Sequence, residues 1–500
     1  MTIGGSSASH RPVGPNVVRV ALALVVAFAA LAAGAGYWQV FQAAPLSSAP
    51  DNPAVVAAAR NVVRGRILDR GGRVLASNVP AAGGGAYRAY ADASIAPLIG
   101  YASSLYGTAG LERAYNAQLT GLQTGDPVAD ALRKFQATPD DPADLTLSLS
   151  LPLQQKAVAL LGADRGSVVM LDPSTGEVLA MASTPTYDAS AIADPATARA
   201  AWAAVQANAG HPLLDRAIQG LYVPGSVFKI VTSLAALGSG AITPSTTYPQ
   251  QPGAERSGLV ISGYRVVDGH HLFTGNTALD FTQAIEVSCN IYFALTGLAV
   301  GGAGLAAEAG RLGFGSPLPF DLPTAASQVT SGGGNFGGGF KDPVELANAA
   351  YGQAEVLVTP LQMALVAAAV ANDGVVMTPH LVTSLTTRAG VRTVNPSPWR
   401  DVATPVVANE VKTAMEQAVE SQWGHYFTAG AAVPGIPTAG KTGTAQLGGS
   451  GEPNSWFIGF APVDHPAVAI AVVIEGGGSG LRAAALAGEL MTYDLKGLGS

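Results

Sequence analysis

The chain has 500 residues, enough for two or three domains that each bury a core of their own. Hydrophobic residues make up 48% and charged residues only 12%, and the formal net charge is −7 without a cluster of basic residues, which argues against nucleic acid as a partner. A single cysteine, Cys289, excludes an intrachain disulfide.

The first predicted element is a membrane-spanning helix. Residues 20–38 carry no charge and are about long enough to cross a bilayer as a helix. Arg11 and Arg19 precede this run, and the first charge beyond it is Asp51. By the positive-inside rule, the short N-terminus stays in the cytoplasm and everything after the helix is exported.

This pattern predicts a cytoplasmic tail at residues 1–19 and a transmembrane anchor at residues 20–40 in the cell membrane. The alternative is a signal peptide that is cleaved near Ala43-Ala44. Because the apolar run is longer than the hydrophobic region of most signal peptides, the sequence favours an uncleaved anchor.

Residues 41–143 are predicted to form a small, β-rich stalk or pedestal domain. A linker rich in Pro, Ser and Ala covers residues 43–53, and residues 64–76 read as two strands around a turn at Gly71-Gly72. A short helical stretch is expected near residues 111–119. The segment is too small and too irregular to carry chemistry of its own.

A second domain is predicted at residues 144–500. Residues 151–161 are amphipathic, and the apolar runs on either side of Gly176 predict a hairpin. Near the C-terminus, residues 438–446, 456–461 and 467–474 read as three further strands, which short connections make antiparallel neighbours.

Helical patterns, such as residues 360–372 and 408–420, lie between the two sets of strands. The simplest architecture is one antiparallel sheet that is built from both ends of the domain and covered by helices, an α+β fold.

Ser226 and Lys229 form the only Ser-x-x-Lys pair in the chain. If both residues are helical, their side chains share a face, and the lysine can act as base for the serine hydroxyl. Pro224-Gly225 precedes the pair, and apolar residues at helical spacing follow it. A capping serine beside a solvated lysine gives the same pattern, so the pair alone is weak.

Two more short motifs strengthen the prediction that the Ser226–Lys229 pair is catalytic. Ser288-Cys289-Asn290 is the only Ser-x-Asn, on a predicted helical stretch from residue 282 to 294. Lys441-Thr442-Gly443 is the only Lys-Thr-Gly, on a predicted strand. Each of them could be ordinary structure, but the three in this order are the signature of penicillin-binding proteins and class A β-lactamases.

The chain resembles a class B penicillin-binding protein over nearly its whole length. Beyond the three motifs, the resemblance rests on residues 64–70 (Arg-Gly-Arg-Ile-Leu-Asp-Arg), 172–177, 290–293, 358–364 and 454–462. It implies the serine penicillin-recognising transpeptidase fold, with a five-stranded antiparallel sheet covered by helices.

The resemblance also implies roles for the motif residues. Ser226 would form an acyl-enzyme, with Lys229 as its base. Burial and the charge of Lys441 would lower the pKa of Lys229. Ser288 would relay a proton to the departing amine, and Asn290 would hold the amide of the substrate.

The strand motif would bind the donor peptide. By resemblance, Lys441, Thr442 and Thr444 would bind its terminal carboxylate, and Gly443 would let a ligand approach the strand closely. The backbone N–H groups of Ser226 and Thr444 would form the oxyanion hole.

The implied substrate is the D-Ala-D-Ala end of a peptidoglycan stem peptide, and β-lactams would acylate the same serine. The segment between anchor and catalytic domain is too short for a glycosyltransferase domain. The chain would thus cross-link glycan but not polymerise it, and the resemblance implies a membrane-embedded glycan polymerase of the SEDS type as partner.

Two alternatives stay open. A β-lactamase or β-lactam sensor shares the catalytic motifs, although no loop with a deacylating glutamate is evident and the anchor and stalk would be surplus. A catalytically silent cell-wall scaffold is disfavoured because all three motifs are intact. No cofactor is expected, and no metal site, because no His/Cys pair has ligand spacing; the adjacent pair His270-His271 is the nearest approach.

Overall fold

The computed structural model describes residues 14–38, 63–81, 86–121, 142–268, 271, 277–428, 430–446 and 451–497. The chain divides into two compact units, Met1–Asn61 and Val62–Ser500, and each is described here by itself.

The described part of the first unit is a single apolar helix, α1 (Gly14–Gly36). Its 23 residues correspond to a length of about 34 Å at 1.5 Å per residue, slightly more than the roughly 30 Å hydrocarbon core of a bilayer. Residues 17–36 have a mean hydropathy of 2.4. The helix predicted from the uncharged run is therefore present, and it is long and apolar enough to cross a membrane.

A five-stranded antiparallel sheet forms the centre of the second unit. Its strand order is β15-β16-β17-β7-β8, so the two strands from the start of the domain pair with the three from its end. The strands are β7 (Gly166–Leu171), β8 (Val178–Thr184), β15 (Ala439–Ala445), β16 (Asn454–Ala461) and β17 (Val468–Ile474). The predicted antiparallel sheet and its hairpin are confirmed.

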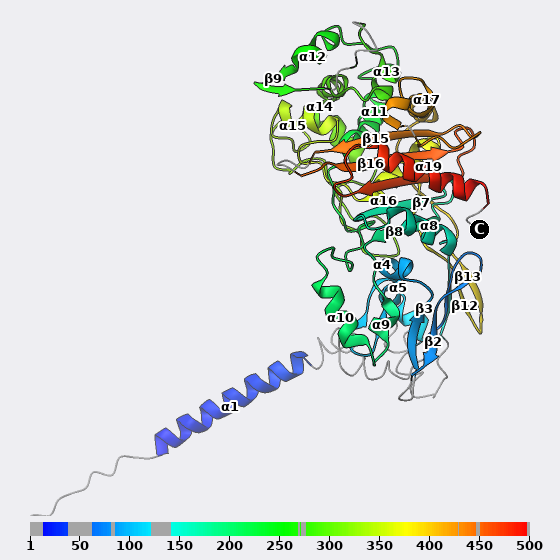
Figure 1. Ribbon diagram of the computed structural model, residues 1–500. Coiled ribbons are helices and arrows are strands. Elements are labelled where there is room, and N and C mark those ends of the chain that lie inside the picture. Colours follow the sequence, from blue (N-terminus) through cyan, green and yellow to red (C-terminus); the bar gives the residue numbers. More distant parts are fainter. Residues whose placement is uncertain are drawn as a thin grey trace, which may run out of the picture. The chain divides into compact units, whose positions relative to one another are not determined.

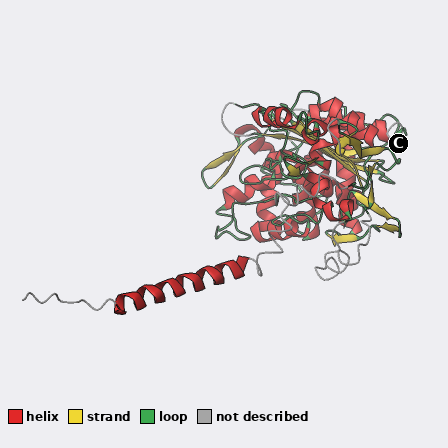
Figure 2. Ribbon diagram, turned by 90° about the horizontal axis from the view of Figure 1, so that it is seen from below, coloured by secondary structure: helices red, strands yellow, loops and turns green. Residues whose placement is uncertain are grey.

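Helices cover both faces of this sheet, which explains why its three central strands, β16, β17 and β7, are buried at every position (Figures 1 and 2). Alternate residues of β17 belong to different clusters: Val473 lies in the cluster that contains α16 (Pro360–Ala371), and Val472 lies with α8 (Leu151–Leu161) and α19 (Leu481–Leu495). Side chains of a strand point to opposite faces in turn, so each face has its own core.

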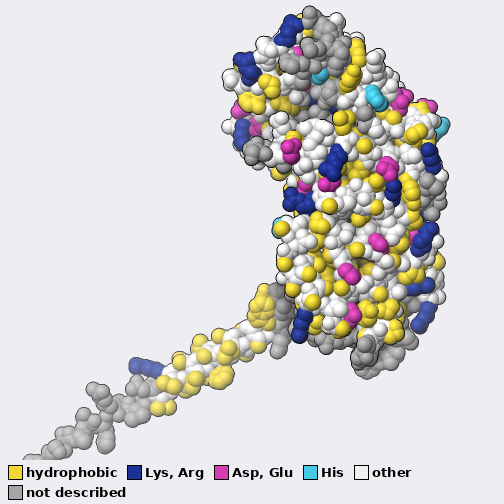
Figure 3. Space-filling model, in the orientation of Figure 1, with side chains coloured by type: hydrophobic (Ala, Val, Ile, Leu, Met, Phe, Trp, Pro, Cys, Tyr) yellow, Lys and Arg dark blue, Asp and Glu magenta, His cyan; other side chains and the backbone are white. Residues whose placement is uncertain are grey.

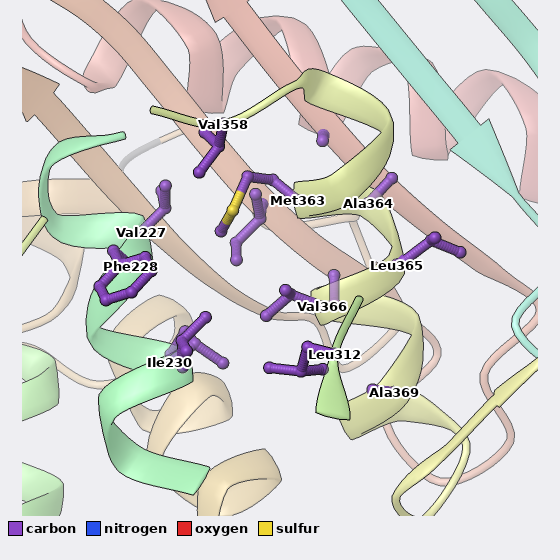
Figure 4. Close-up of a cluster of buried hydrophobic side chains, with 14 of the residues drawn as sticks. Val227, Phe228, Ile230, Leu312, Val358, Met363, Ala364, Leu365, Val366 and Ala369 are labelled. Carbon is purple, nitrogen blue, oxygen red and sulfur yellow. The ribbon is translucent and has the colours of Figure 1, made fainter. Parts of the chain in front are cut away.

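A second group of helices packs beyond α16 and carries three of the eight predicted site residues, Ser226, Lys229 and Asn290. It includes η3 (Gly225–Phe228), α11 (Lys229–Gly238), α13 (Phe281–Glu286), α14 (Asn290–Arg311), α15 (Pro343–Ala350) and α17 (Pro405–Glu420). Figure 4 shows Val227, Phe228 and Ile230 pointing toward Met363 and Val366 of α16. This core fixes the segment around Ser226 against the sheet.

A second sheet of six strands has the order β13-β12-β6-β1-β2-β3. It joins strands from both sides of residue 144, because β1 pairs with β6 and β6 pairs with β12. The strands are β1 (Ile67–Leu68), β2 (Val74–Pro80), β3 (Ala86–Tyr90), β6 (Asp144–Leu147), β12 (Val382–Thr387) and β13 (Gly390–Thr393). The predicted pairing around Gly71-Gly72 is that of β1 with β2.

Shorter elements make up the rest of the secondary structure in the described residues of this unit. They are η2 (Ala93–Ile95), α4 (Ala96–Ile99), β4 (Ala102–Ser103), β5 (Gly107–Thr108), α5 (Gly110–Ala114), α6 (Asn116–Thr120), α9 (Ala189–Ala193), α10 (Ala198–Ala207), α12 (Gln251–Ser257), β9 (Leu259–Ile261), β10 (Tyr264–Val266), β11 (Val375–Met377), β14 (Pro398–Asp401) and α18 (His425–Thr428). The helical stretch expected at residues 111–119 is split into α5 and α6, because Tyr115 leaves the helical conformation.

A buried ionic cluster links β3 and α5 in the N-terminal part of this unit. The Glu112 carboxylate, fully buried, accepts from Arg88 Nε at 2.6 Å and from Arg64 Nε at 2.8 Å. The two guanidinium groups hold the pKa of Glu112 below its ordinary value against the opposing effect of burial.

We expect Glu112→Gln to destabilise the protein by about 3–5 kcal/mol, because it leaves two buried arginines without their counter-charge. The free energy of unfolding from denaturant titration measures this. The matched control is Glu489→Gln, which removes a more exposed pair with Lys156 and should cost no more than about 1 kcal/mol. Equal losses of unfolding free energy in the two variants would show that the buried cluster stabilises the protein no more than the exposed ion pair does.

Candidate active site

A cleft of about 750 Å³ brings together residues from segments that are far apart in the sequence. Five of the eight predicted site residues line it: Ser226, Ser288, Asn290, Thr442 and Thr444. Of the other three, Lys229 and Lys441 are buried, and Gly443 also lies in the strand interior. On the face seen in Figure 3, acidic and basic side chains are scattered rather than gathered into a basic patch.

Ser226 lies in the short 3₁₀ helix η3, and Lys229 begins α11 directly after it. The two residues thus occupy one turn, as the spacing predicts, although that turn is 3₁₀ rather than α-helical. The turn is tightly packed: Gly225 has a φ of 58°, and a Cβ atom there would lie 2.8 Å from the carbonyl oxygen of Thr444. Glycine is required at this position because any side chain would push Ser226 away from β15.

The Lys229 amine is fully buried and surrounded by acceptors from the Ser288–Asn290 turn. Its Nζ donates to the Ser288 carbonyl oxygen, to Ser288 Oγ at 3.2 Å and to Asn290 Oδ1 at 2.8 Å. Burial lowers the pKa of Lys229 to about 8, and the charge of Asp268 opposes that shift. The expected lowering of this pKa by burial is therefore present.

Lys441 approaches the same hydroxyl from β15. Its Nζ donates to Ser288 Oγ at 2.8 Å and to the Thr442 carbonyl oxygen at 3.2 Å. Burial and the repulsion from Lys229 hold the pKa of Lys441 well below its ordinary value. Ser288 Oγ thus connects two buried lysines, and this arrangement gives a proton a short path between them.

The pattern over residues 282–294 predicts that the Ser288–Asn290 motif lies inside one helix, and the structure shows that this prediction is wrong. The motif forms the turn between α13 and α14, where Ser288 adopts a left-handed conformation with a φ of 60°. Cys289 is the N-cap of α14 and its Sγ accepts from the Tyr292 N–H at 3.3 Å. The turn points the carbonyl and hydroxyl oxygens of Ser288 at Lys229, which a continuous helix could not do.

On β15, Thr442 and Thr444 face the cleft, as expected from their alternation with Lys441 and Gly443. Gly443 also has a packing role. A Cβ atom at this position would lie 2.7 Å from the Pro224 carbonyl oxygen and 3.2 Å from Val227. The glycine therefore lets the segment around Ser226 lie close to the strand, and the close approach of a ligand stays a prediction.

Two parts of the cleft were missed by the sequence analysis. One is the β9–β10 hairpin with the residues after it, which contributes Tyr264, Arg265 and Asp268. The other runs from residue 341 to 355. The turn residues Ser262-Gly263 between two apolar runs were a usable hairpin signal. The wall at 341–355 had no motif of its own, since only the tertiary fold brings it to Ser226.

The structure also groups four side chains that could hold a metal ion: Glu255, Asp268, His271 and Cys289. One donor atom from each lies within 4.8 Å of the others. A thiolate, an imidazole and carboxylates are ligands that zinc accepts. The sequence led us to expect no metal site, and this grouping is a candidate that the sequence did not reveal. Spacing along the chain does not show that Glu255 and Cys289, 34 positions apart, meet in space.

Zinc binding by this group would raise the melting temperature of the protein, and Cys289→Ser would then remove most of that shift, because a hydroxyl is a poor zinc ligand. At a hundred times the dissociation constant the stabilisation is about 2.7 kcal/mol. Thermal unfolding with and without Zn²⁺ measures it, and the control is Asp464→Asn, an exposed carboxylate outside this group. No shift in the wild-type chain would show that these side chains bind no zinc.

Comparisons with known proteins agree with this geometry. The family "Penicillin binding protein transpeptidase domain" matches residues 166–492, and "Penicillin binding protein A dimerisation domain" matches residues 64–140. The peptidoglycan D,D-transpeptidase PbpA of Mycolicibacterium smegmatis is 35% identical over 93% of this chain and 94% of its own length. MrdA of Escherichia coli, also a peptidoglycan D,D-transpeptidase, is 29% identical over 78% of this chain and 65% of its own.

A solved structure shows the same likeness in three dimensions. Penicillin-binding protein A from M. tuberculosis, in its penicillin G acyl-enzyme complex, has a TM-score of 0.75 and 30% sequence identity. The match covers 88% of this chain and all of that one. The resemblance predicted from the motifs is thereby confirmed, and this chain belongs to the class B penicillin-binding proteins.

Proposed function

We propose that this chain is a membrane-anchored peptidoglycan D,D-transpeptidase, in which Ser226 takes up the acyl group of a donor stem peptide and passes it to the amine of a neighbouring stem. The observation that carries the proposal is that Ser226 and Ser288 line one cleft while the buried amines of Lys229 and Lys441 both donate to Ser288 Oγ. Relatives named as peptidoglycan D,D-transpeptidases support the same reaction.

The first half-reaction begins at Ser226. Neutral Lys229 removes the proton from the hydroxyl, and the oxygen attacks the carbonyl carbon of the penultimate D-alanine. The N–H groups of Ser226 and Thr444 stabilise the oxyanion that forms. As the amide bond breaks, Ser288 passes a proton to the departing D-alanine amine.

The donor peptide is held from two sides. Thr442 and Thr444 bind its carboxylate, with the charge of Lys441 directly behind them, and Asn290 binds its amide. A β-lactam reacts in the same way, but its leaving group stays attached to the acyl-enzyme. A β-lactam acyl-enzyme has been solved for the M. tuberculosis relative, which supports this step.

The remaining assignments extend the proposal beyond the active site. We assign residues 1–19 to a cytoplasmic tail, 20–40 to the anchor, 41–143 to the pedestal and 144–500 to an extracytoplasmic transpeptidase domain. The separate family matches at 64–140 and 166–492 support the division between pedestal and transpeptidase. The arginines before the apolar run support the orientation.

The partner that this function requires is a membrane glycan polymerase of the SEDS type, bound through the anchor and pedestal. Co-purification of the tagged full-length chain from membranes tests this, with a variant whose anchor is replaced by an unrelated transmembrane helix as control. Recovery of a polymerase with the wild-type chain supports the assignment, and recovery of none contradicts it.

Labelling with a fluorescent penicillin separates the proposed function from a β-lactamase and from a catalytically silent scaffold. A transpeptidase gives an adduct that persists for many minutes. Fast release of the hydrolysed drug would indicate a β-lactamase, and the absence of any adduct would indicate a scaffold. The structure favours the first outcome because Ser226, Ser288 and Asn290 line the cleft and Lys229 donates to Ser288 Oγ.

A further inference from the structure

The cleft has a second wall that the donor peptide does not use under the proposed function. Residues 341–355 contribute Lys341, Asp342, Glu345 and Glu355 to its lining, three carboxylates and one amine. The β15 side, by contrast, has the buried amine of Lys441 behind two threonines. The donor ends in a carboxylate and the acceptor in an amine, so the two sides suit groups of opposite charge.

Two of the three carboxylates on this wall are engaged by the protein itself. Glu345 accepts from Thr330 Oγ1 at 2.7 Å and from the Lys341 N–H at 2.6 Å, one bond to each oxygen. Asp342 is the N-cap of α15 and accepts from the Glu345 N–H at 2.8 Å. Both carboxylates hold the start of α15 in place.

Glu355, the third carboxylate of this wall, is held less tightly by the protein. Its side chain is 51% exposed, and its ion pair with Lys341 has a long N···O distance of 3.9 Å between two exposed groups. Such a contact contributes little and is easily exchanged for another. Among the carboxylates of this wall, Glu355 is therefore the one that can receive a cation from outside.

The backbone that carries Glu355 is fixed to the segment that carries Ser226. The Gly225 N–H donates to the Gly352 carbonyl oxygen at 2.9 Å, and Tyr222 and Val358 exchange hydrogen bonds at 2.9 and 2.8 Å. Residues 352–358 thus pair with residues 222–225 at both ends.

The two segments lie very close together at Gly225 and Gly352. A Cβ atom on Gly352 would lie 1.8 Å from the Gly225 carbonyl oxygen. Gln328 Nε2 holds the carbonyl oxygen of Glu355 itself at 2.9 Å. A group placed on such a rigid ladder keeps a constant relation to Ser226, as a binding residue for the second substrate must.

We infer that Glu355 binds the ammonium group of the acceptor stem peptide and holds that nitrogen toward acyl-Ser226. This inference rests on the proposed function. After the ammonium has released one proton to solvent, the amine nitrogen attacks the ester carbonyl carbon. The new C–N bond forms, the bond from that carbon to Ser226 Oγ breaks, and Oγ takes the second amine proton. Glu355 binds and orients the acceptor and takes no part in acylation.

The test measures cross-linking by the full-length chain while the acceptor amine and the donor peptide are varied separately. Glu355→Gln is expected to raise the KM for the acceptor about threefold, the effect of losing about 0.7 kcal/mol from a partly exposed ion pair. The KM for the donor and the rate of penicillin acylation should not change. The control Asp464→Asn removes an exposed carboxylate in the turn between β16 and β17, outside the cleft, and should change none of these values.

Hydroxylamine, which is uncharged at pH 8, serves as a second acceptor. Wild type and Glu355→Gln should use it equally well, because it offers no ammonium group. An unchanged KM for the acceptor amine, or an equal loss with hydroxylamine, would overturn the inference. Either result is distinct from failure of the proposed function, which would appear as a wild-type chain that forms no penicillin adduct.

Discussion

Replacing Ser226 with alanine is expected to lower the rate of stem-peptide cross-linking by about 10⁶-fold, the size of effect seen when the serine nucleophile is removed from subtilisin, a serine enzyme that also acts through an acyl-enzyme. The loss is large because no acyl-enzyme can form. The fold should survive, since Ser226 lines the cleft and the neighbouring Val227 and Phe228 supply the packing.

Ser239→Ala is the matched control for this variant. Ser239 lies just past the end of α11, and its hydroxyl bonds only within that turn, to the Ala235 and Ala236 carbonyl oxygens. Its cross-linking rate should stay close to that of the wild-type chain. Substantial activity in Ser226→Ala would mean that another residue accepts the acyl group.

Replacing Lys229 with arginine is expected to lower the rate of penicillin acylation by about 10²–10⁴-fold, the usual contribution of a general base. Arginine keeps the positive charge but cannot lose its proton. Lys229→Met, which removes the charge and keeps much of the apolar stem, should show a similar loss. If only one of the two variants lost activity, charge or size at this position would matter more than proton transfer.

The wild-type chain should show the same chemistry in its pH profile. The pKa of Lys229 is lowered to about 8, and only the neutral amine can accept the proton of Ser226. The rate constant for penicillin acylation should therefore increase from pH 6, pass its midpoint near pH 8 and level off above it. Stopped-flow or quenched labelling measures this profile, and a rate that falls over the same range would exclude Lys229 as the base.

Much of the fold could be predicted from local patterns. Strict apolar runs around Gly176 and near the C-terminus predict the strands of the central sheet, and the short connections between them set their pairing. The uncharged residues 20–38 predict α1. These elements follow from the sequence because hydrophobic periodicity and turn residues act over a few positions at a time.

The site was predicted less completely than the fold, and the physical reason is different for each part of the site. The three motifs could be found because each one is short. The left-handed turn at Ser288 was missed, since the apolar pattern runs on without showing that α13 ends at its C-cap Val287 and that α14 begins at its N-cap Cys289. Glu355 had no signal at all, because its relation to Ser226 depends on hydrogen bonds to residues about 130 positions earlier.

The most direct measurement of the central claim is peptide mapping of the penicillin G adduct by mass spectrometry. The full-length chain is incubated with penicillin G, digested and examined for the peptide that carries the added mass of the opened drug. The account predicts one modified site, Ser226, with an adduct that is absent from Ser226→Ala. An adduct on another residue, such as Ser288 or Cys289, or no adduct at all, would contradict it.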